Sequence, residues 1–120
     1  MNFSVSTELV DEDIAVIDLK GEVDLYTAPE FKQHLLKQLE QGVTKLIIDF
    51  TDTTFIDSTT LGVLVGGVKR LRPLGGQLVL VCSDRNIIKI FEITGLHRVF
   101  DIHATREDAL EAVRAAAAAG

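Results

Sequence analysis

Asp57 and Ser58 are the residues of this chain whose types and spacing most directly suggest chemistry. They lie in the stretch 45–67. A short apolar run comes first, then an acid- and threonine-rich segment that we expect to be a loop, and helical spacing begins at Ser58. The first backbone N–H groups of a helix lack partners and favour negative charge. A phosphate, which carries about two negative charges at neutral pH, is therefore well tolerated on a serine there. We expect Ser58 to be a phosphorylation site, with Thr59 as the alternative acceptor and Thr60 chemically eligible.

The Ser58 hydroxyl also has a purely structural interpretation. A serine at the start of a helix commonly accepts a hydrogen bond from the N–H groups of the first turn and has no further role. If Ser58 is instead a switch, its phosphate would stabilise the helix rather than melt it, so the effect should act at the surface. New charge and bulk would repel a partner that packs against Ser58 and Gly62.

Two aspartates accompany the serine. Asp57 precedes Ser58, and Asp24 lies in the loop predicted over 21–26, after the second predicted strand. If the second and third predicted strands are neighbours in the sheet, the loops after them lie at the same end. Asp24 would then hold the Ser58 hydroxyl or help to bind a metal–nucleotide complex brought by a kinase. The alternative for each aspartate is turn and cap chemistry.

The helix predicted over 58–71 contains three glycines. At 100° per residue, one side of this helix forms the core face, made of Leu61, Leu64, Val65, Val68 and Leu71. The rest of the circumference carries Gly62, Val63, Gly66, Gly67 and Arg70. Each interior glycine costs roughly 1 kcal/mol relative to alanine. Either a smooth outer surface lets another backbone come close, or the glycines make a tight internal contact. The outward Val63 slightly favours a partner surface.

The elements that position these residues follow from hydrophobic periodicity. Period-two alternation and short apolar runs predict strands over 2–9, 14–20, 45–50, 77–81 and 99–102. Helical spacing with start and stop signals predicts helices over 27–41, 58–71, 84–93 and from 105 onward. The order β-β-α-β-α-β-α-β-α, opening on an antiparallel hairpin, is typical of an α/β fold with a mixed sheet of about five strands and about four helices.

Length and composition indicate one folded domain over residues 1–120, with 115–120 as a frayed tail. Of the 120 residues, 47% are hydrophobic and 25% are charged, which supplies a core and argues against general disorder. The net charge is −6. Nucleic acids and anionic membranes both require clustered Lys and Arg, so we expect neither as a partner.

The cysteine count and the apolar segments favour a cytoplasmic protein. The single cysteine, Cys82, cannot form an internal disulfide, which suits a reducing compartment. No apolar stretch reaches the roughly 20 residues of a membrane helix, and the first residues lack the features of a signal peptide. The histidines show no metal-ligand spacing, and no GxSxG elbow surrounds a serine. We therefore expect no metal, no cofactor and no enzymatic activity.

The chain resembles the single-domain anti-sigma factor antagonists of the STAS family, from residue 3 to about residue 113. The first matching motif is GEVD at 21–24, with Thr27-Ala28 after it. Next come Ile48-Asp49 and the run FIDST at 55–59 with Leu61-Gly62. Further on, the matches are Gly75-Gly76, the strand LVLVC, and Phe91 through Thr94-Gly95-Leu96. Each motif alone is weak, but together they are a specific signal.

The resemblance implies the STAS fold and a place in a partner-switching circuit. In this family the unphosphorylated antagonist binds an anti-sigma factor that is also a serine kinase, and this frees the sigma factor. The kinase, which brings ATP and Mg²⁺, phosphorylates the serine after the aspartate, here Ser58. Phosphorylation breaks the complex, and a PPM-type serine phosphatase restores it. The resemblance places Asp24 and Asp57 along the acceptor site. Together with the outward surface of the helix, the expected partner surface comprises Asp24, Asp57, Ser58, Thr59, Gly62, Val63 and Gly66.

One position departs from the family pattern. The family usually has a glycine two residues after the acceptor, whereas this chain has Thr60. We expect its branched side chain at the edge of the partner contact, where it affects how tightly the usual partner binds. Its hydroxyl offers a second acceptor for the phosphate. The chain is expected to be a monomer.

Two other functions stay open. A response-regulator receiver domain has a similar length and an α/β fold, and Asp49 follows a strand where its phosphorylated aspartate would lie. However, no acidic pair follows the first strand, and two consecutive opening strands depart from the receiver order. A small-ligand-binding STAS module would instead use the corner of Asp24, Asp57 and Ser58, although no general base is evident there.

Overall fold

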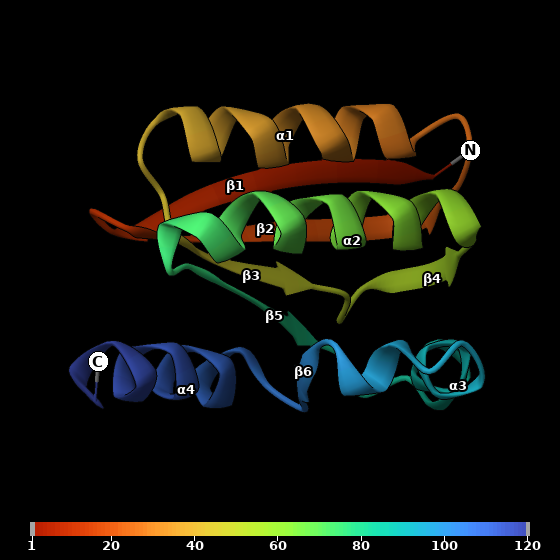
Figure 1. The fold of residues 1–120 in the computed structure, drawn as a ribbon. Helices are drawn as coiled ribbons and strands as arrows, with labels where there is room; N and C mark the ends of the chain where they lie inside the picture. Colours follow the sequence, from red (N-terminus) through yellow and green to blue (C-terminus); the bar gives the residue numbers. More distant parts are fainter. Residues whose placement is uncertain (1, 120) are drawn as a thin grey trace.

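The computed structural model describes residues 2–119, which form a mixed β-sheet with helices on both faces (Figure 1). The strands are β1 (Phe3–Asp11), β2 (Ile14–Val23), β3 (Lys45–Asp49), β4 (Thr53–Ile56), β5 (Gln77–Val81) and β6 (Asp101–His103). The helices are α1 (Ala28–Glu40), α2 (Ser58–Leu71), α3 (Arg85–Ile93) and α4 (Arg106–Ala119). Two short 3₁₀ turns, η1 (Arg72–Leu74) and η2 (Leu96–Arg98), follow α2 and α3. The predicted α/β class is confirmed.

The strand order is β1-β2-β3-β5-β6. β4 is not in this series; it pairs with the last residues of β2, beyond the part of β2 that pairs with β3. β1 and β2 form the predicted antiparallel hairpin, whereas the other described pairings are parallel. Parallel neighbours need a crossover, and α1 and α2 supply two of them, so both helices run back along the sheet in the same direction. The loops after β2 and β4 therefore leave the sheet at one shared end.

The sheet has six strands rather than the predicted five or so. The additional strand is β4, which lies in the segment predicted to be a loop. Its four residues, TTFI, mix polar and apolar types and are too few for period-two alternation to show. β4 forms because β2 extends beyond β3 and offers a free edge, where Val23 pairs with Ile56. The order of helices and strands is therefore β-β-α-β-β-α-β-α-β-α.

β2 continues past Gly21 to Val23, although this glycine predicted the start of a loop. Gly21 adopts a φ of 87°, and a β-carbon there would lie 1.8 Å from the carbonyl oxygen of Asn2. The register with β4 shifts between Gly21 and Glu22. Glycine at a bulge with a close backbone approach is compatible with a strand interior. In the sequence alone, such a glycine cannot be told from one that ends a strand.

The sheet buries a core on each face. The larger core packs the sheet against α1, α2 and α3, and its bulkiest members are Phe31, Phe50, Phe91 and Phe100. The smaller core lies under α4, where Ala109 and Val113 contact Ile14, Val16, Ile47, Val79 and Val81. Burial on both faces explains why β3 and β5 are continuous apolar runs. The predicted fraying of residues 115–120 stays a prediction, and Gly120 lies outside the described residues.

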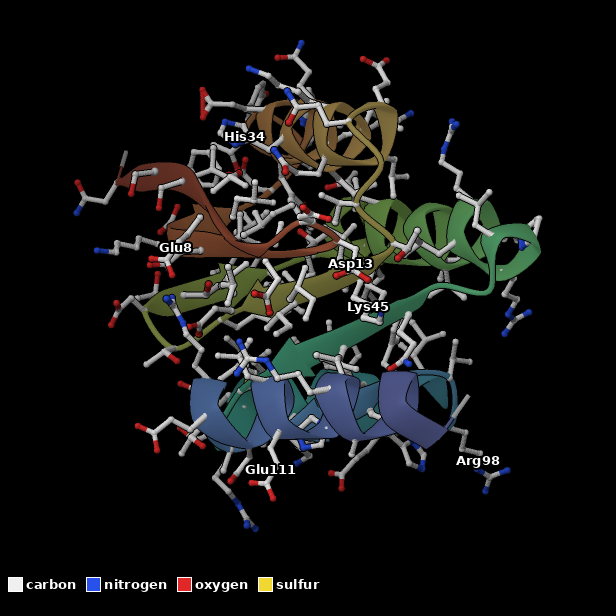
Figure 2. All side chains as sticks on the ribbon, turned by 90° about the vertical axis from the view of Figure 1, so that its left-hand side faces the viewer. Glu8, Asp13, His34, Lys45, Arg98 and Glu111 are labelled. Atoms are coloured by element: carbon white, nitrogen blue, oxygen red, sulfur yellow. The ribbon has the colours of Figure 1, made fainter. Side chains whose placement is uncertain are left out.

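An ion pair closes the end of the sheet opposite the loops after β2 and β4. Lys45, the first residue of β3, and Asp13, just before β2, point toward one another in Figure 2, and their side chains form a salt bridge. The hydrogen bond from Lys45 is the main reason that the pKa of Asp13 is lowered. In the same view Glu111 lies on the side of α4 turned away from the sheet. This ion pair has a structural role, and the candidate site lies at the other end of the sheet.

Candidate functional site

The loops after β2 and β4 meet at Asp57. Val23 and Ile56 are paired in the parallel ladder, so Asp24 and Asp57 each follow directly after a paired residue. The backbone N–H of Leu25, in the loop after β2, helps to lower the pKa of the Asp57 carboxyl. The two aspartates therefore lie at the same end of the sheet, as expected. The second and third predicted strands, β2 and β3, are neighbours as that expectation required, and β4, which ends just before Asp57, pairs with the remaining part of β2.

Asp57, not Ser58, caps α2. The Oδ1 atom of Asp57 accepts hydrogen bonds from the backbone nitrogen of Thr59, at 3.0 Å, and from that of Thr60, at 3.4 Å. Ser58 is the first residue inside the helix. The interpretation of Ser58 as the helix cap is therefore wrong. A carboxylate cap already satisfies the first turn, which leaves the serine side chain without a structural task there.

The Asp57 carboxylate is stabilised in its charged form. Burial would raise its pKa, but hydrogen bonds from the Thr59 hydroxyl and from the backbone N–H groups of Thr60, Thr59 and Leu25 outweigh burial. The net result is a lowered pKa for Asp57. At neutral pH a full negative charge therefore stands beside Ser58.

The three consecutive hydroxyls at the start of α2 have different environments. Ser58 is exposed, and no described residue hydrogen-bonds with its hydroxyl. Thr59 is half-buried and donates its hydroxyl to Asp57. Thr60 is fully buried, and its hydroxyl donates to the carbonyl oxygen of Val23 at 2.9 Å. Only Ser58 presents a hydroxyl that an external enzyme can reach without breaking an internal bond.

This placement corrects the expectation for Thr60. Its side chain lies inside the fold, with an exposed fraction of 0%, rather than at the contact edge. The methyl and hydroxyl groups therefore do not bear directly on docking, and Thr60 is not accessible as a second acceptor. Burial of this threonine was missed because the helical pattern assigned the core face to Leu61 and not to its neighbour.

Asp24 organises its own loop. Its Oδ1 atom accepts the backbone N–H groups of Tyr26 at 2.9 Å and Thr27 at 3.1 Å. The Thr27 hydroxyl accepts the Asp24 backbone N–H at 2.8 Å. No hydrogen bond joins Asp24 to Ser58 among the described residues. The turn interpretation of Asp24 thus accounts for its contacts, and the expectation that it holds the Ser58 hydroxyl is wrong.

The tight turn at Asp24 leaves large apolar side chains facing outward. Leu25 is 62% exposed and Tyr26 is 79% exposed. Phe55, in the neighbouring β4, is 49% exposed. All three belong to the two segments that meet beside Ser58, where large exposed apolar side chains are available for contact with another protein. We call Leu25, Tyr26 and Phe55 the apolar rim of the Ser58 site. Sequence reasoning missed it, although two large apolar residues inside a predicted loop were a usable signal.

The glycines of α2 divide between the two explanations that the sequence left open. A β-carbon on Gly67 would lie 2.9 Å from Leu78 and 3.1 Å from Leu35, so this glycine makes a tight internal contact. A β-carbon on Gly62 or Gly66 would meet nothing within 4 Å. The core face of α2 is correspondingly shifted, and its buried residues are Thr60, Leu64, Gly67 and Leu71. Gly62 and Gly66 therefore form an open surface.

The helices α1 and α2 leave a groove of about 330 Å³ between them. It is lined by Lys32, Leu35, Leu36, Thr59, Gly62, Val63, Gly66, Gly67 and Arg70. The half-buried Val63 lies in this groove, beside the open glycines. The structure thus brings Thr59, Gly62, Val63 and Gly66 onto one continuous surface that begins next to Ser58.

The receiver interpretation fails at Asp49. This side chain is buried, with an exposed fraction of 4%, on the sheet face that α4 covers. It accepts hydrogen bonds from Arg106 at 3.0 Å and from the backbone N–H of Thr51 at 2.9 Å. A carboxylate occupied in this way is not placed to take a phosphoryl group from solvent. The antiparallel opening hairpin also departs from a receiver.

The described residues contain no group of three or more His, Cys, Asp and Glu side chains placed to hold a metal ion. None of the helices within 2–119 has the length and apolar character to cross a membrane. What the site offers is an exposed hydroxyl at a helix start, an adjacent carboxylate, an apolar rim and a groove. Such an arrangement suits covalent modification and protein docking.

Comparison with known proteins agrees with this description. The profile of the STAS domain matches residues 8–109. An anti-sigma-B factor antagonist of Bacillus subtilis (strain 168) is 38% identical over 111 residues, which cover 92% of this chain and 100% of that protein.

Two solved structures, both of SpoIIAA, share the fold. The anti-sigma factor antagonist SpoIIAA in its unphosphorylated form has a TM-score of 0.75 and 26% identity, over 92% of this chain and 98% of that one. The Bacillus cell fate determinant SpoIIAA in its phosphorylated form has a TM-score of 0.74 and 26% identity, over 92% of this chain and 99% of that one. The chain therefore belongs to the STAS domain family.

Proposed function

We propose that this protein is an anti-sigma factor antagonist, switched by phosphorylation of Ser58. In the proposal its unphosphorylated form binds an anti-sigma factor with serine kinase activity, and the sigma factor is thereby released. The observation that carries the proposal is the environment of Ser58, the exposed and unbonded hydroxyl among three at the start of α2. The antagonist role is supported by the similarity to anti-sigma factor antagonists, and modification is supported by the phosphorylated form of SpoIIAA.

The fold explains why a phosphate on Ser58 would act on the partner and not on the antagonist. The start of α2 favours negative charge, so the modified chain keeps its helix. Asp57 already carries a charge beside the acceptor, and its carboxylate is turned to the backbone of the first turn. A phosphate therefore adds about two charges at the outer surface, where a docked protein would have to desolvate them.

The groups that react belong to other proteins in this proposal. The kinase supplies ATP and Mg²⁺, and a PPM-type serine phosphatase removes the phosphate. Asp24 and Asp57 shape the two loops around the acceptor and take no proton in the reaction. The antagonist itself has no catalytic activity, and we propose that it works as a monomer in the cytoplasm.

The proposal is tested by binding of the purified anti-sigma factor from the same genome. Wild type and Ser58→Ala should bind it, whereas Ser58→Asp should bind much more weakly. Thr59→Ser is the matched control and should bind like wild type, because it keeps the hydroxyl that donates a hydrogen bond to Asp57. Equal binding by wild type, Ser58→Ala and Ser58→Asp would show that Ser58 is not the switch, and absence of binding by wild type would remove the antagonist role itself.

A further inference from the structure

The groove between α1 and α2 extends well beyond the Ser58 site. A second hollow of about 410 Å³ adjoins the first and shares Leu36 and Arg70 with it. Its other lining residues are Leu39, Glu40 and Leu74. The two helices lie side by side and run in the same direction (Figure 1). We call the two hollows together the α1–α2 groove, whose lining extends from Thr59 to Leu74.

The floor of the α1–α2 groove is bare at two glycines. Gly62 and Gly66 are one turn apart on α2, and a β-carbon on either would meet nothing within 4 Å. Glycine inside a helix is unfavourable relative to alanine, and no internal contact requires it at these two positions. A surface without side chains lets another main chain approach closely. The internal packing of this chain thus explains Gly67 but leaves Gly62 and Gly66 unexplained.

The edge of the groove carries positive charge in a chain whose net charge is −6. Lys32 lies on the α1 side and Arg70 on the α2 side. The salt bridges among the described residues involve Lys45, Arg106 and Arg114, so neither Lys32 nor Arg70 is neutralised by one. Glu40 is the one acidic residue in the lining, at the far end of the groove. The groove therefore suits an occupant with acidic flanks.

The apolar lining and the length of the groove favour a helix as the occupant. The 14 residues of α2 span about 21 Å at 1.5 Å per residue, which matches a helix of about four turns. An extended segment would need free backbone groups to pair with, and the interiors of α1 and α2 use theirs within each helix. Leu36, Leu39, Val63 and Leu74 supply apolar contacts instead.

We propose that the α1–α2 groove binds an amphipathic helix of the anti-sigma factor, with a narrow apolar face flanked by acidic residues. The apolar face packs on Gly62, Gly66 and Leu36, and the acids pair with Lys32 and Arg70. This inference rests on the proposed function and names the part of the partner that the surface recognises. It also gives the switch a mechanism, because one end of the groove lies beside Ser58. A phosphate there repels the acidic flank that the cationic edge attracts.

The test measures binding of the same purified anti-sigma factor by calorimetry. Gly66→Gln fills the floor, and Lys32→Glu with Arg70→Glu reverses the edge. Each change should weaken binding about tenfold or more, while the melting temperature shows that the fold is retained. Lys20→Glu is the control for charge. This exposed residue lies on β2 in register with Ser4, on the sheet face away from the groove, and its reversal should leave binding unchanged.

The outcomes separate the groove from the switch. If wild type binds, Ser58→Asp fails to bind, and the groove variants bind like wild type, the groove inference is overturned and the proposed function stands. If wild type itself does not bind the anti-sigma factor, both are overturned. A further test replaces acidic residues in one helix of the anti-sigma factor by lysine. If such a change restores binding to the Arg70→Glu variant, it supports the pairing of Arg70 with an acidic residue of that helix. Failure of every such change to restore binding contradicts it.

Discussion

Thr60 and Val23 are joined by a buried hydrogen bond of 2.9 Å from the threonine hydroxyl to the valine carbonyl oxygen. This bond fastens the first turn of α2 to the end of β2, the two segments that frame Ser58. Thr60→Val keeps the shape but leaves the carbonyl oxygen without this donor. We expect a loss of roughly 1–3 kcal/mol in the free energy of unfolding, measured with urea. Thr60→Ser should lose less, since it keeps the hydroxyl, and equal stability of the valine variant would refute the role.

Asp57 caps α2, so its removal should weaken the helix start. We expect Asp57→Asn to cost up to about 1 kcal/mol near neutral pH, since asparagine still accepts from the backbone but carries no charge. The pKa of Asp57 is lowered by the fold, so its stabilising charge is fully present above the ordinary value of about 3.9 and is lost as the pH falls through the lowered pKa. The difference between wild type and Asp57→Asn should therefore vanish in acid. A difference that is constant with pH would contradict this account.

Asp18 should respond to pH in the opposite direction. Burial and the nearby Asp49 carboxylate raise its pKa, against the opposing effect of Arg106. A carboxyl whose pKa is raised by folding stabilises the fold while it is protonated, and this contribution is lost as the pH rises through the raised pKa. Relative to wild type, Asp18→Asn should therefore gain stability between about pH 4 and neutral pH. Thermal unfolding at several pH values measures this, and an increasing disadvantage of the variant would be the contrary result.

Gly66 and Gly67 are adjacent in α2 and form a matched pair. Gly66→Ala places its methyl in open space and should raise the free energy of unfolding by up to about 1 kcal/mol through helix propensity. Gly67→Ala brings its methyl to 2.9 Å from Leu78 and should lower it by roughly 1–3 kcal/mol through overpacking. Chemical denaturation of both variants decides the point. Effects of the same sign would mean that the two environments are not distinct.

Local sequence patterns were sufficient for the parts of the fold whose signals are local. The period-two alternation gave the opening hairpin, and helical spacing placed the start of α2 at Ser58. The order of the strands predicted that the loops carrying Asp24 and Asp57 lie at one end of the sheet if the second and third strands are neighbours, and β2 and β3 are neighbours. β4 was missed because a four-residue strand with two threonines forms in response to the free edge of β2. That edge is a product of the tertiary structure, and no local pattern encodes it.

The candidate site shows the same division. The position of Asp57 and Ser58 at the start of a helix follows from residue type and helical spacing. Which glycines of α2 are open does not, because the packing of Leu35 and Leu78 separates Gly67 from Gly66. The cap, the burial of Thr60 and the contribution of Lys32 from α1 depend on how α1, α2 and β2 pack together. Helical spacing alone sets the relative positions of residues around a helix, but the exact rotation against the sheet comes from packing. A shift of one residue was enough to bury Thr60 fully and to leave Leu61 only partly buried against the core.

The central claim is that a single hydroxyl, that of Ser58, receives a phosphate and that this ends binding to the anti-sigma factor. The most direct measurement incubates the purified chain with the anti-sigma factor from its own genome, ATP and Mg²⁺. Mass spectrometry then maps the modified residue, and size-exclusion chromatography follows the complex. We expect one phosphate on Ser58, none on Thr59 or Thr60, and loss of the complex with the anti-sigma factor. A phosphate at another residue, or a complex that persists after Ser58 is fully modified, would contradict it.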